Sequence, residues 1–152
     1  MAKVLKERKD VDLALTWDLS AIYATDEKFQ SAVKEMKGLS LKIEKDYKGK
    51  LNTENKINEC LDELIKLYQY RDLTSSYVEL SVWVDYANNE NQDKYSKIIN
   101  IISDIESRLS FIESEIIQAN DEVLDVAISE SKENSNYLKD KKEKRYMRFI
   151  QK

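Results

Sequence analysis

Carboxylates are the side chains through which this chain could do chemistry. Of its 152 residues, 29 are Asp or Glu and none is His. Close pairs occur at Glu113 with Glu115 and at Asp121 with Glu122, and a carboxylate pair performs acid–base catalysis when its two environments differ. On helices as highly charged as these, however, neighbouring acids usually form a solvated face. We therefore expect no catalytic dyad, and no catalytic activity from this chain alone.

The chain also has few residues that could bind a metal or serve as a catalytic nucleophile. The lack of His removes the commonest general base, the commonest metal ligand and the usual partner of a catalytic nucleophile. A zinc site would need Cys60 together with carboxylates alone, which is a poor match to the usual ligand sets. Cys60 lies between Ile57 and Leu64 at helical spacing, so we expect a packed apolar side chain rather than a reactive thiol. We expect no metal ligand and no cofactor-binding residue in the chain.

Charge and hydropathy limit the partners. The net charge is -4 and the pI is near 5.1, whereas a nucleic-acid surface needs clustered excess Lys and Arg. The basic run at 139–148 is interrupted by Asp140 and Glu143, which favours a solvated helix face over a phosphate-binding patch. No window approaches the roughly 18 apolar residues of a membrane span, and no apolar segment follows the charged N-terminus. With a single Cys, these features predict a cytoplasmic protein that binds neither nucleic acid nor membrane.

The elements that must position these residues are predicted to be helices. Pro is 0 and Gly is 2, so the strongest helix breakers are nearly missing. Apolar residues recur three and four apart through most of the chain, which indicates amphipathic helices. We expect an all-α fold, an antiparallel bundle of three long helices plus a weaker fourth, with an N-terminal arm at 1–15 and a single domain at 16–152. The expected helices span about 26–47, 53–87, 92–118 and 121–147.

Two of these helices have an unusual apolar face. The helix at 53–87 carries Arg71 and Ser75 in the middle of its apolar face, which fits a polar pair that is buried or faces a dimer partner. The helix at 121–147 has a thin face made of Leu124, Ala127, Ser131, Asn134 and Leu138. Since an apolar face needs a covering element, we expect the partner of this thin face to lie outside the chain, in a missing domain or a second copy.

The segment before the first helix contains one of the two tryptophans. It reads "TWDLSAIYATDEKF" at 16–29, and its apolar side chains, Trp17 included, are expected to pack back on the first turns of the helix. Together with "RKDV" at 8–11, this stretch resembles the opening of oligoendopeptidase F, a bacterial relative of thimet oligopeptidase among the zinc metallopeptidases. That family typically begins with Arg-x-x-Val or Arg-x-x-Ile and continues with Trp-Asp-Leu-Ser.

Further matches to this family follow in order along nearly the whole chain. They are "DYKGKL" at 46–51, similar to a Tyr-Lys-Gly-Lys-Leu connector, "SSYVELSVWVDYANNEN" at 75–91, similar to a long helix and its turn, "LSFIESEII" at 109–117, similar to Ser-Phe-x-x-Pro-Glu, and "NYLKDKKEKR" at 136–145, similar to a Tyr-rich basic helix. Ser114 stands where the family usually has proline, so no kink is expected there. The family positions that the resemblance identifies are Trp17, Asp18, Leu19, Ser20, Tyr23, Tyr47, Gly49, Leu51, Phe111 and Glu115.

The resemblance implies an architectural role. In the family, the N-terminal helical domain packs on the zinc domain and helps to wall a deep channel, in which zinc-bound water hydrolyses short unfolded peptides. The resemblance therefore adds a second interpretation of Arg71 and Ser75, as residues that face such a channel. The chain has no His-Glu-x-x-His motif, so no catalytic or metal-binding residue carries over, and zinc is expected in the parent enzyme only. We expect a fragment or truncated gene product whose partners are the missing C-terminal zinc catalytic domain and, through it, short peptides. Two alternatives stay open: a free-standing helical interaction protein, and a self-associating bundle that forms a homo-oligomer.

Overall fold

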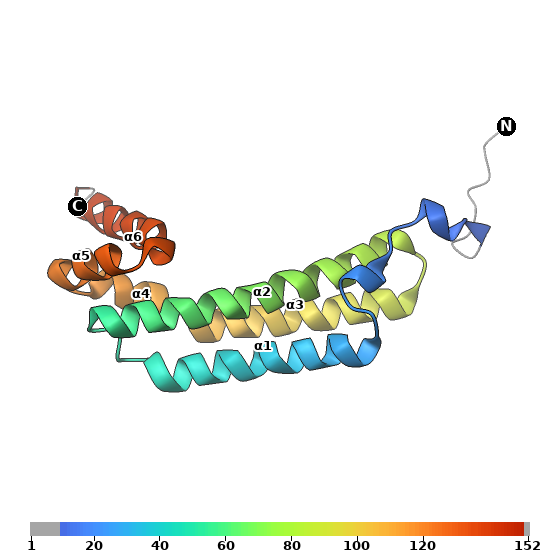
Figure 1. The fold of residues 1–152 in the computed structure, drawn as a ribbon, viewed down its shortest axis with the longest axis horizontal. Coiled ribbons are helices and arrows are strands. Elements are labelled where there is room, and N and C mark those ends of the chain that lie inside the picture. The colour runs from blue at the N-terminus through green and yellow to red at the C-terminus, as the bar shows by residue number, and fades with distance from the viewer. Residues whose placement is uncertain (1–9, 151–152) are drawn as a thin grey trace.

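The chain folds into helices joined by short turns. The computed structural model describes residues 10–150, so the first nine residues of the expected N-terminal arm lie outside the described part. No β-strand occurs within residues 10–150, which confirms the all-α fold. Three long antiparallel helices, α1 (Asp26–Tyr47), α2 (Glu54–Val84) and α3 (Asn89–Leu109), lie side by side and form an elongated bundle (Figure 1).

Capping side chains fix where these three helices begin. The residue before each one is Thr25, Thr53 or Asn88, and its side-chain oxygen accepts a hydrogen bond from a backbone N–H of the first turn. Each such cap contributes about 1 kcal/mol. The first helix has the bounds expected from the sequence, and the second ends at Val84, three residues earlier than expected.

The helix expected over 92–118 is divided at Ser110. After α3, the chain continues as the short helix α4 (Phe111–Gln118). The Ser110 N–H and the Ser110 hydroxyl both donate to the Ser107 carbonyl, at 3.4 and 2.9 Å. This tighter bonding and the back-bonding serine bend the helical path. Ser114, where the family that the sequence resembles usually has proline, lies inside α4, so the bend occurs four residues before it.

The helix expected over 121–147 is also divided, and this changes the role of its thin apolar face. The segment forms two helices, α5 (Asp121–Glu130) and α6 (Lys132–Ile150), because Ser131 takes an extended conformation between them. They fold back on each other across one end of the bundle (Figure 1). Leu124, Ala127 and Leu138 are completely buried there. The expectation of an external partner for this face is therefore wrong, since α2, α4 and the hairpin itself cover it.

The apolar core has two parts. The larger part joins α1 and α2 to the α4–α6 end of the bundle, and its fully buried members include Ile43, Ile57, Leu67, Ile116 and Leu138. The smaller part lies at the opposite end and consists of Phe29, Val33, Val78 and Ile98. Between the two, on α2, lies the polar stretch with Arg71 that the sequence pattern indicated.

Candidate functional site

Family positions from two distant segments meet at the α4 end of the bundle. Gly49 follows α1 with φ 76°, a left-handed conformation that glycine adopts without the strain of a side chain. On α4, Glu115 accepts two backbone hydrogen bonds from this connector: its Oε1 lies 2.7 Å from the Gly49 nitrogen and its Oε2 lies 3.4 Å from the Leu51 nitrogen. We call Gly49, Leu51 and Glu115 the Glu115 joint.

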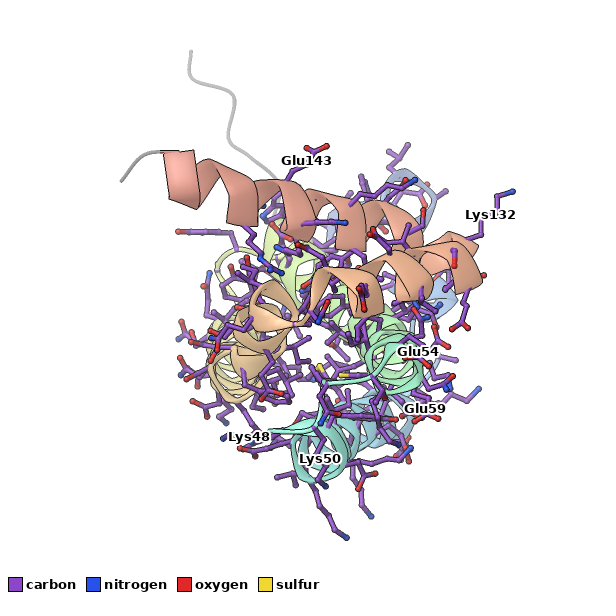
Figure 2. The ribbon with its side chains drawn as sticks, turned by 90° about the vertical axis from the view of Figure 1, so that its left-hand side faces the viewer. Lys48, Lys50, Glu54, Glu59, Lys132 and Glu143 are labelled. Atoms are coloured by element: carbon purple, nitrogen blue, oxygen red, sulfur yellow. The ribbon has the colours of Figure 1, made fainter. Side chains whose placement is uncertain are left out.

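The residues on either side of Gly49 are exposed lysines and buried apolar side chains. Figure 2 looks onto this end of the bundle and labels the two exposed lysines Lys48 and Lys50. The Lys48 Nζ lies 2.9 Å from Glu44 Oε1, and the Lys50 Nζ donates to the Lys45 carbonyl at 3.0 Å. Tyr47 and Leu51 are buried in the larger core, and burial raises the pKa of Tyr47. Phe111 is half-buried, with the Lys48 Nζ 5.9 Å from the centre of its ring. The connector thus turns its backbone and its apolar side chains inward and its charges outward.

The two neighbouring acids of α4 do different jobs. Glu115 serves the joint, whereas Glu113 lies 2.9 Å from the Nζ of the buried Lys141 of α6. Residues two apart on a helix point to different faces, so the pair is no acid–base dyad. Glu115 accepts backbone hydrogen bonds, which places it outside the solvated face that the sequence favoured.

The family positions in the N-terminal segment build a capped turn. The Asp18 Oδ1 accepts hydrogen bonds from the Ser20 N–H at 3.0 Å and the Ser20 hydroxyl at 2.6 Å, and this caps a single 3-10 turn, η3 (Leu19–Ala21). The Tyr23 ring then packs edge-on against Phe29 at 5.6 Å and against Tyr77 of α2 at 5.3 Å. Tyr23 therefore packs on the first turn of α1 as expected, and burial raises the pKa of its hydroxyl.

Trp17 does not pack on that turn. Its side chain is 66% exposed and lies beside Trp83 of α2, which is 70% exposed. The two rings border a surface groove of about 240 Å³. The expectation for Trp17 is wrong because Tyr23 already covers Phe29. We call the surface formed by Leu15, Thr16, Trp17, Leu80, Trp83 and Val84 the tryptophan groove.

A second concave surface lies around Arg71. This cleft of about 310 Å³ opens between α2, α3, α4 and α6 and has an apolar floor that includes Leu67 and Ile105. The Arg71 guanidinium lies 4.1 Å from the centre of the Tyr68 ring, an arrangement typical of cation–π stacking. The Arg71 Nη2 lies 2.8 Å from Asp72 Oδ1, and the Arg71 Nη1 lies 3.7 Å from Glu106 Oε1. We call this surface the Arg71 cleft.

Ser75 does not share the cleft with Arg71. Its hydroxyl donates to the Asp72 carbonyl of the same helix at 3.2 Å, and it is absent from the residues that line the cleft. The polar pair indicated by the sequence is therefore divided, with Arg71 in the concave surface and Ser75 bonded to its own helix.

The far wall of the Arg71 cleft is a phenol held in its neutral form. Burial, followed by the negative charge of Glu113, raises the pKa of Tyr137 to about 12. Lys141 lies 4.9 Å from the centre of the Tyr137 ring. At neutral pH the lining of the cleft therefore combines the Arg71 guanidinium and hydroxyl groups with the carboxyl side chains of Glu106 and Glu113, above an apolar floor. These groups can hold an amphipathic ligand, such as a peptide segment, but none of them is an activated nucleophile.

The single cysteine is a core residue. Cys60 is fully buried, and burial, with the nearby charges of Glu115 and Glu63, raises the pKa of its thiol to about 12. Within the part of the chain that the structure describes, no three Cys, Asp or Glu side chains gather in a way that could hold a metal ion. None of the helices in this part is both long and apolar enough to cross a lipid bilayer.

Comparisons with known proteins do not add a relative. No protein-family model, curated protein or solved structure matches this chain.

Proposed function

We propose that this chain is the N-terminal helical domain of a zinc metallopeptidase of the oligoendopeptidase F type, which acts in the cytoplasm and forms part of the wall of a channel for short peptides. The parent enzyme hydrolyses oligopeptides with zinc held by its C-terminal catalytic domain. This chain contributes no ligand and no reactive group. Its contribution is shape, since long packed helices restrict which substrates reach the catalytic centre.

The observation that carries this proposal is the Glu115 joint. The resemblance identifies Tyr47, Gly49 and Leu51 in one segment and Phe111 and Glu115 in another. Glu115 bonds directly to the backbone of Gly49, which is 66 positions away in the chain. A joint of this kind needs a residue that tolerates φ 76° and a long acceptor on the facing helix. This gives a physical reason for both segments to recur together in one family of helical domains.

The Arg71 cleft supports the assignment of a peptide-facing surface. An extended peptide exposes backbone carbonyls, which accept hydrogen bonds from Arg71 and Tyr137, and alternate side chains, which pack on an apolar floor. Arg71 is about 29% exposed, so it reaches solvent without leaving the Tyr68 ring. We assign this cleft to the channel side of the domain.

The experiment that tests the proposal begins with the gene. The reading frame is expected to continue past codon 152 to a His-Glu-x-x-His sequence, and a stop codon directly after codon 152 contradicts the parentage. In the intact parent enzyme, Arg71→Ala is expected to raise KM for a short quenched peptide several-fold while kcat stays unchanged, because the role proposed for Arg71 is to bind the peptide and not to take part in the zinc chemistry. Glu35→Ala, an exposed change on α1, is the matched control. Equal KM values for the two variants contradict the role given to the cleft.

A free-standing interaction protein is the second candidate function. The observation that favours it is the tryptophan groove, because two large indole rings on a monomer surface are typical of a binding site.

A further inference from the structure

We propose that the tryptophan groove docks a basic segment of another protein, in which Lys or Arg side chains flank an apolar anchor. This inference rests on the groove and its surrounding charge, and it holds whichever of the two candidate functions is correct.

The groove is an apolar surface that no described side chain of the bundle covers. Leu15 is 79% exposed, Trp17 66%, Trp83 70% and the neighbouring Tyr86 78%. The chain has only two tryptophans, and both border this groove. Figure 1 shows that the segment carrying Trp17 lies against the end of the bundle where α2 passes into α3, opposite the α5–α6 hairpin. Exposed aromatic rings of this kind are the commonest anchors of protein interfaces.

The charge around the groove is strongly acidic. Residues 10–27 contain five Asp or Glu, residues 73–93 contain four more, and neither segment contains Lys or Arg. These 39 residues therefore carry a net charge of -9, whereas the remaining 113 residues sum to +5, because the whole chain carries -4. Lys94 of α3 reaches this end, but its Nζ is 2.9 Å from the Asp26 Oδ1. The surface thus joins indole rings to a surplus of carboxylates.

Exposed indole rings beside carboxylates indicate which kind of segment can bind in the groove. Lys and Arg side chains pair with carboxylates and also stack on indole faces, while an aliphatic anchor fills an apolar groove. Glu79 lies one helical turn before Trp83, and Asp18 follows Trp17 directly, so both charges flank the rings. A second copy of this chain placed groove against groove is a poor occupant, because two acidic surfaces would repel each other.

The probe is a fluorescein-labelled peptide in which Leu-Lys-Lys-Leu is repeated three times, added to the full chain at about 150 mM salt. Binding is followed by peptide anisotropy and by tryptophan emission, which reports on the groove because both indoles border it. We expect saturable binding with a blue shift of the emission. Peptides with every Leu replaced by Ser, or every Lys by Glu, are expected to bind at least about tenfold more weakly. If the peptide with Ser in place of Leu binds as tightly as the probe, charge attraction alone accounts for the binding and the proposal is overturned.

Variants locate the binding on the molecule. Trp83→Ala is expected to weaken binding at least about tenfold, and Glu79→Lys several-fold. The matched controls are Leu41→Ala, at another exposed apolar residue, and Glu130→Lys, at an exposed acid of the α5–α6 hairpin. Far-UV circular dichroism verifies that each variant is folded. Equal effects of the groove variants and their controls overturn the proposal.

Two other occupants are separated by the same assay. Residues 1–9 contain four basic residues and one acid, which is the chemistry that the groove is proposed to bind. If replacing the four basic residues by Ser raises the affinity for the probe about fivefold or more, the chain itself occupies its groove and the proposal of an external partner falls. If sedimentation shows a dimer that Trp83→Ala dissociates, the occupant is a second copy, and the proposal falls as well. An unchanged affinity and a monomeric chain support it.

Discussion

Replacing Glu115 with alanine removes the acceptor for two backbone N–H groups at once. The bond from Gly49 is short, 2.7 Å, and a hydrogen bond to a charged group contributes about 1.5–3 kcal/mol. The bond from Leu51 is long, 3.4 Å, and contributes about 0.5–1 kcal/mol. Gly49 is exposed, so water replaces part of its bond, whereas Leu51 is only 3% exposed. We expect the free energy of unfolding to fall by about 2–3 kcal/mol in total.

Urea and thermal unfolding followed by far-UV circular dichroism measure this loss. For a chain of 152 residues, the expected decrease in Tm is about 5–10 °C. Glu115→Gln keeps one side-chain carbonyl oxygen as an acceptor, so it is expected to lose about 1 kcal/mol. Glu35→Ala, at an exposed carboxylate of α1, is the control and is expected to stay within about 0.5 kcal/mol of the parent chain. The reasoning is refuted if Glu115→Ala and Glu35→Ala unfold at the same urea concentration.

Three further predictions concern the two glycines of the first helix and its connector, the buried cysteine and the tyrosine of the Arg71 cleft. Gly49→Ala is expected to lower the free energy of unfolding by about 1–2 kcal/mol because Gly49 has φ 76°. Gly38→Ala, in the open middle of α1, is expected to raise it by about 0.5–1 kcal/mol. Urea unfolding of both variants measures these changes, and a change of the same sign in both contradicts the prediction. Cys60, whose pKa is raised to about 12 by burial, is expected to resist iodoacetamide at mildly alkaline pH until urea unfolds the chain, as measured by mass spectrometry; labelling of the folded protein at the rate of a free thiol argues against the buried position. Because the pKa of Tyr137 is raised to about 12, the folded state keeps this proton where the unfolded chain has lost it, so stability is complete below the ordinary tyrosine pKa and falls as pH rises toward about 12. Unfolding at several pH values is expected to show a shallower fall for Tyr137→Phe, and parallel curves refute the assignment.

The overall fold was predictable because it depends on repeated local signals. Scarce helix breakers and long apolar stripes determine that the chain is helical, and Thr25 and Thr53 mark helix starts by the residue type that caps them. Ser40 interrupts the apolar stripe of α1, and the partner that accounts for it is distant in the chain. The Arg108 guanidinium donates to the Ser40 hydroxyl at 2.9 Å, which satisfies this buried group.

The helix breaks were not predicted because serine carries an ambiguous signal. Ser110 and Ser131 lie in continuous helical patterns, and a serine either stays within a helix or interrupts it through hydrogen bonds to nearby backbone. At Ser131, the side chain accepts a hydrogen bond from the Asn134 N–H at 3.3 Å and so starts α6. The sequence shows a serine three residues before an asparagine at this point, but the apolar residues on both sides continue the helical spacing and so predicted one continuous helix.

The contacts between distant segments were beyond the reach of the pattern. The Asn134 amide nitrogen lies 3.1 Å from both Asn58 Oδ1 and Asp62 Oδ1, which ties α6 to α2 through a buried polar group. In the same way, nothing near Glu115 in the sequence indicates that its acceptors face the connector after α1. Trp17 precedes α1 by only a few residues in the sequence, yet it lies beside Trp83 of α2, while Tyr23 packs on Phe29 of α1. Such choices depend on three-dimensional packing rather than on periodicity.

The central claim, that this chain acts by shape as one part of a larger peptidase, is tested most directly by a binding measurement. The chain is mixed with the separately expressed zinc domain from the same reading frame, and the mass of the mixture is determined by size-exclusion chromatography with light scattering. We predict a one-to-one complex that persists at about 10 µM of each protein. Two components that elute at their own masses even at about 100 µM would contradict the account, as would a reading frame that encodes no zinc domain.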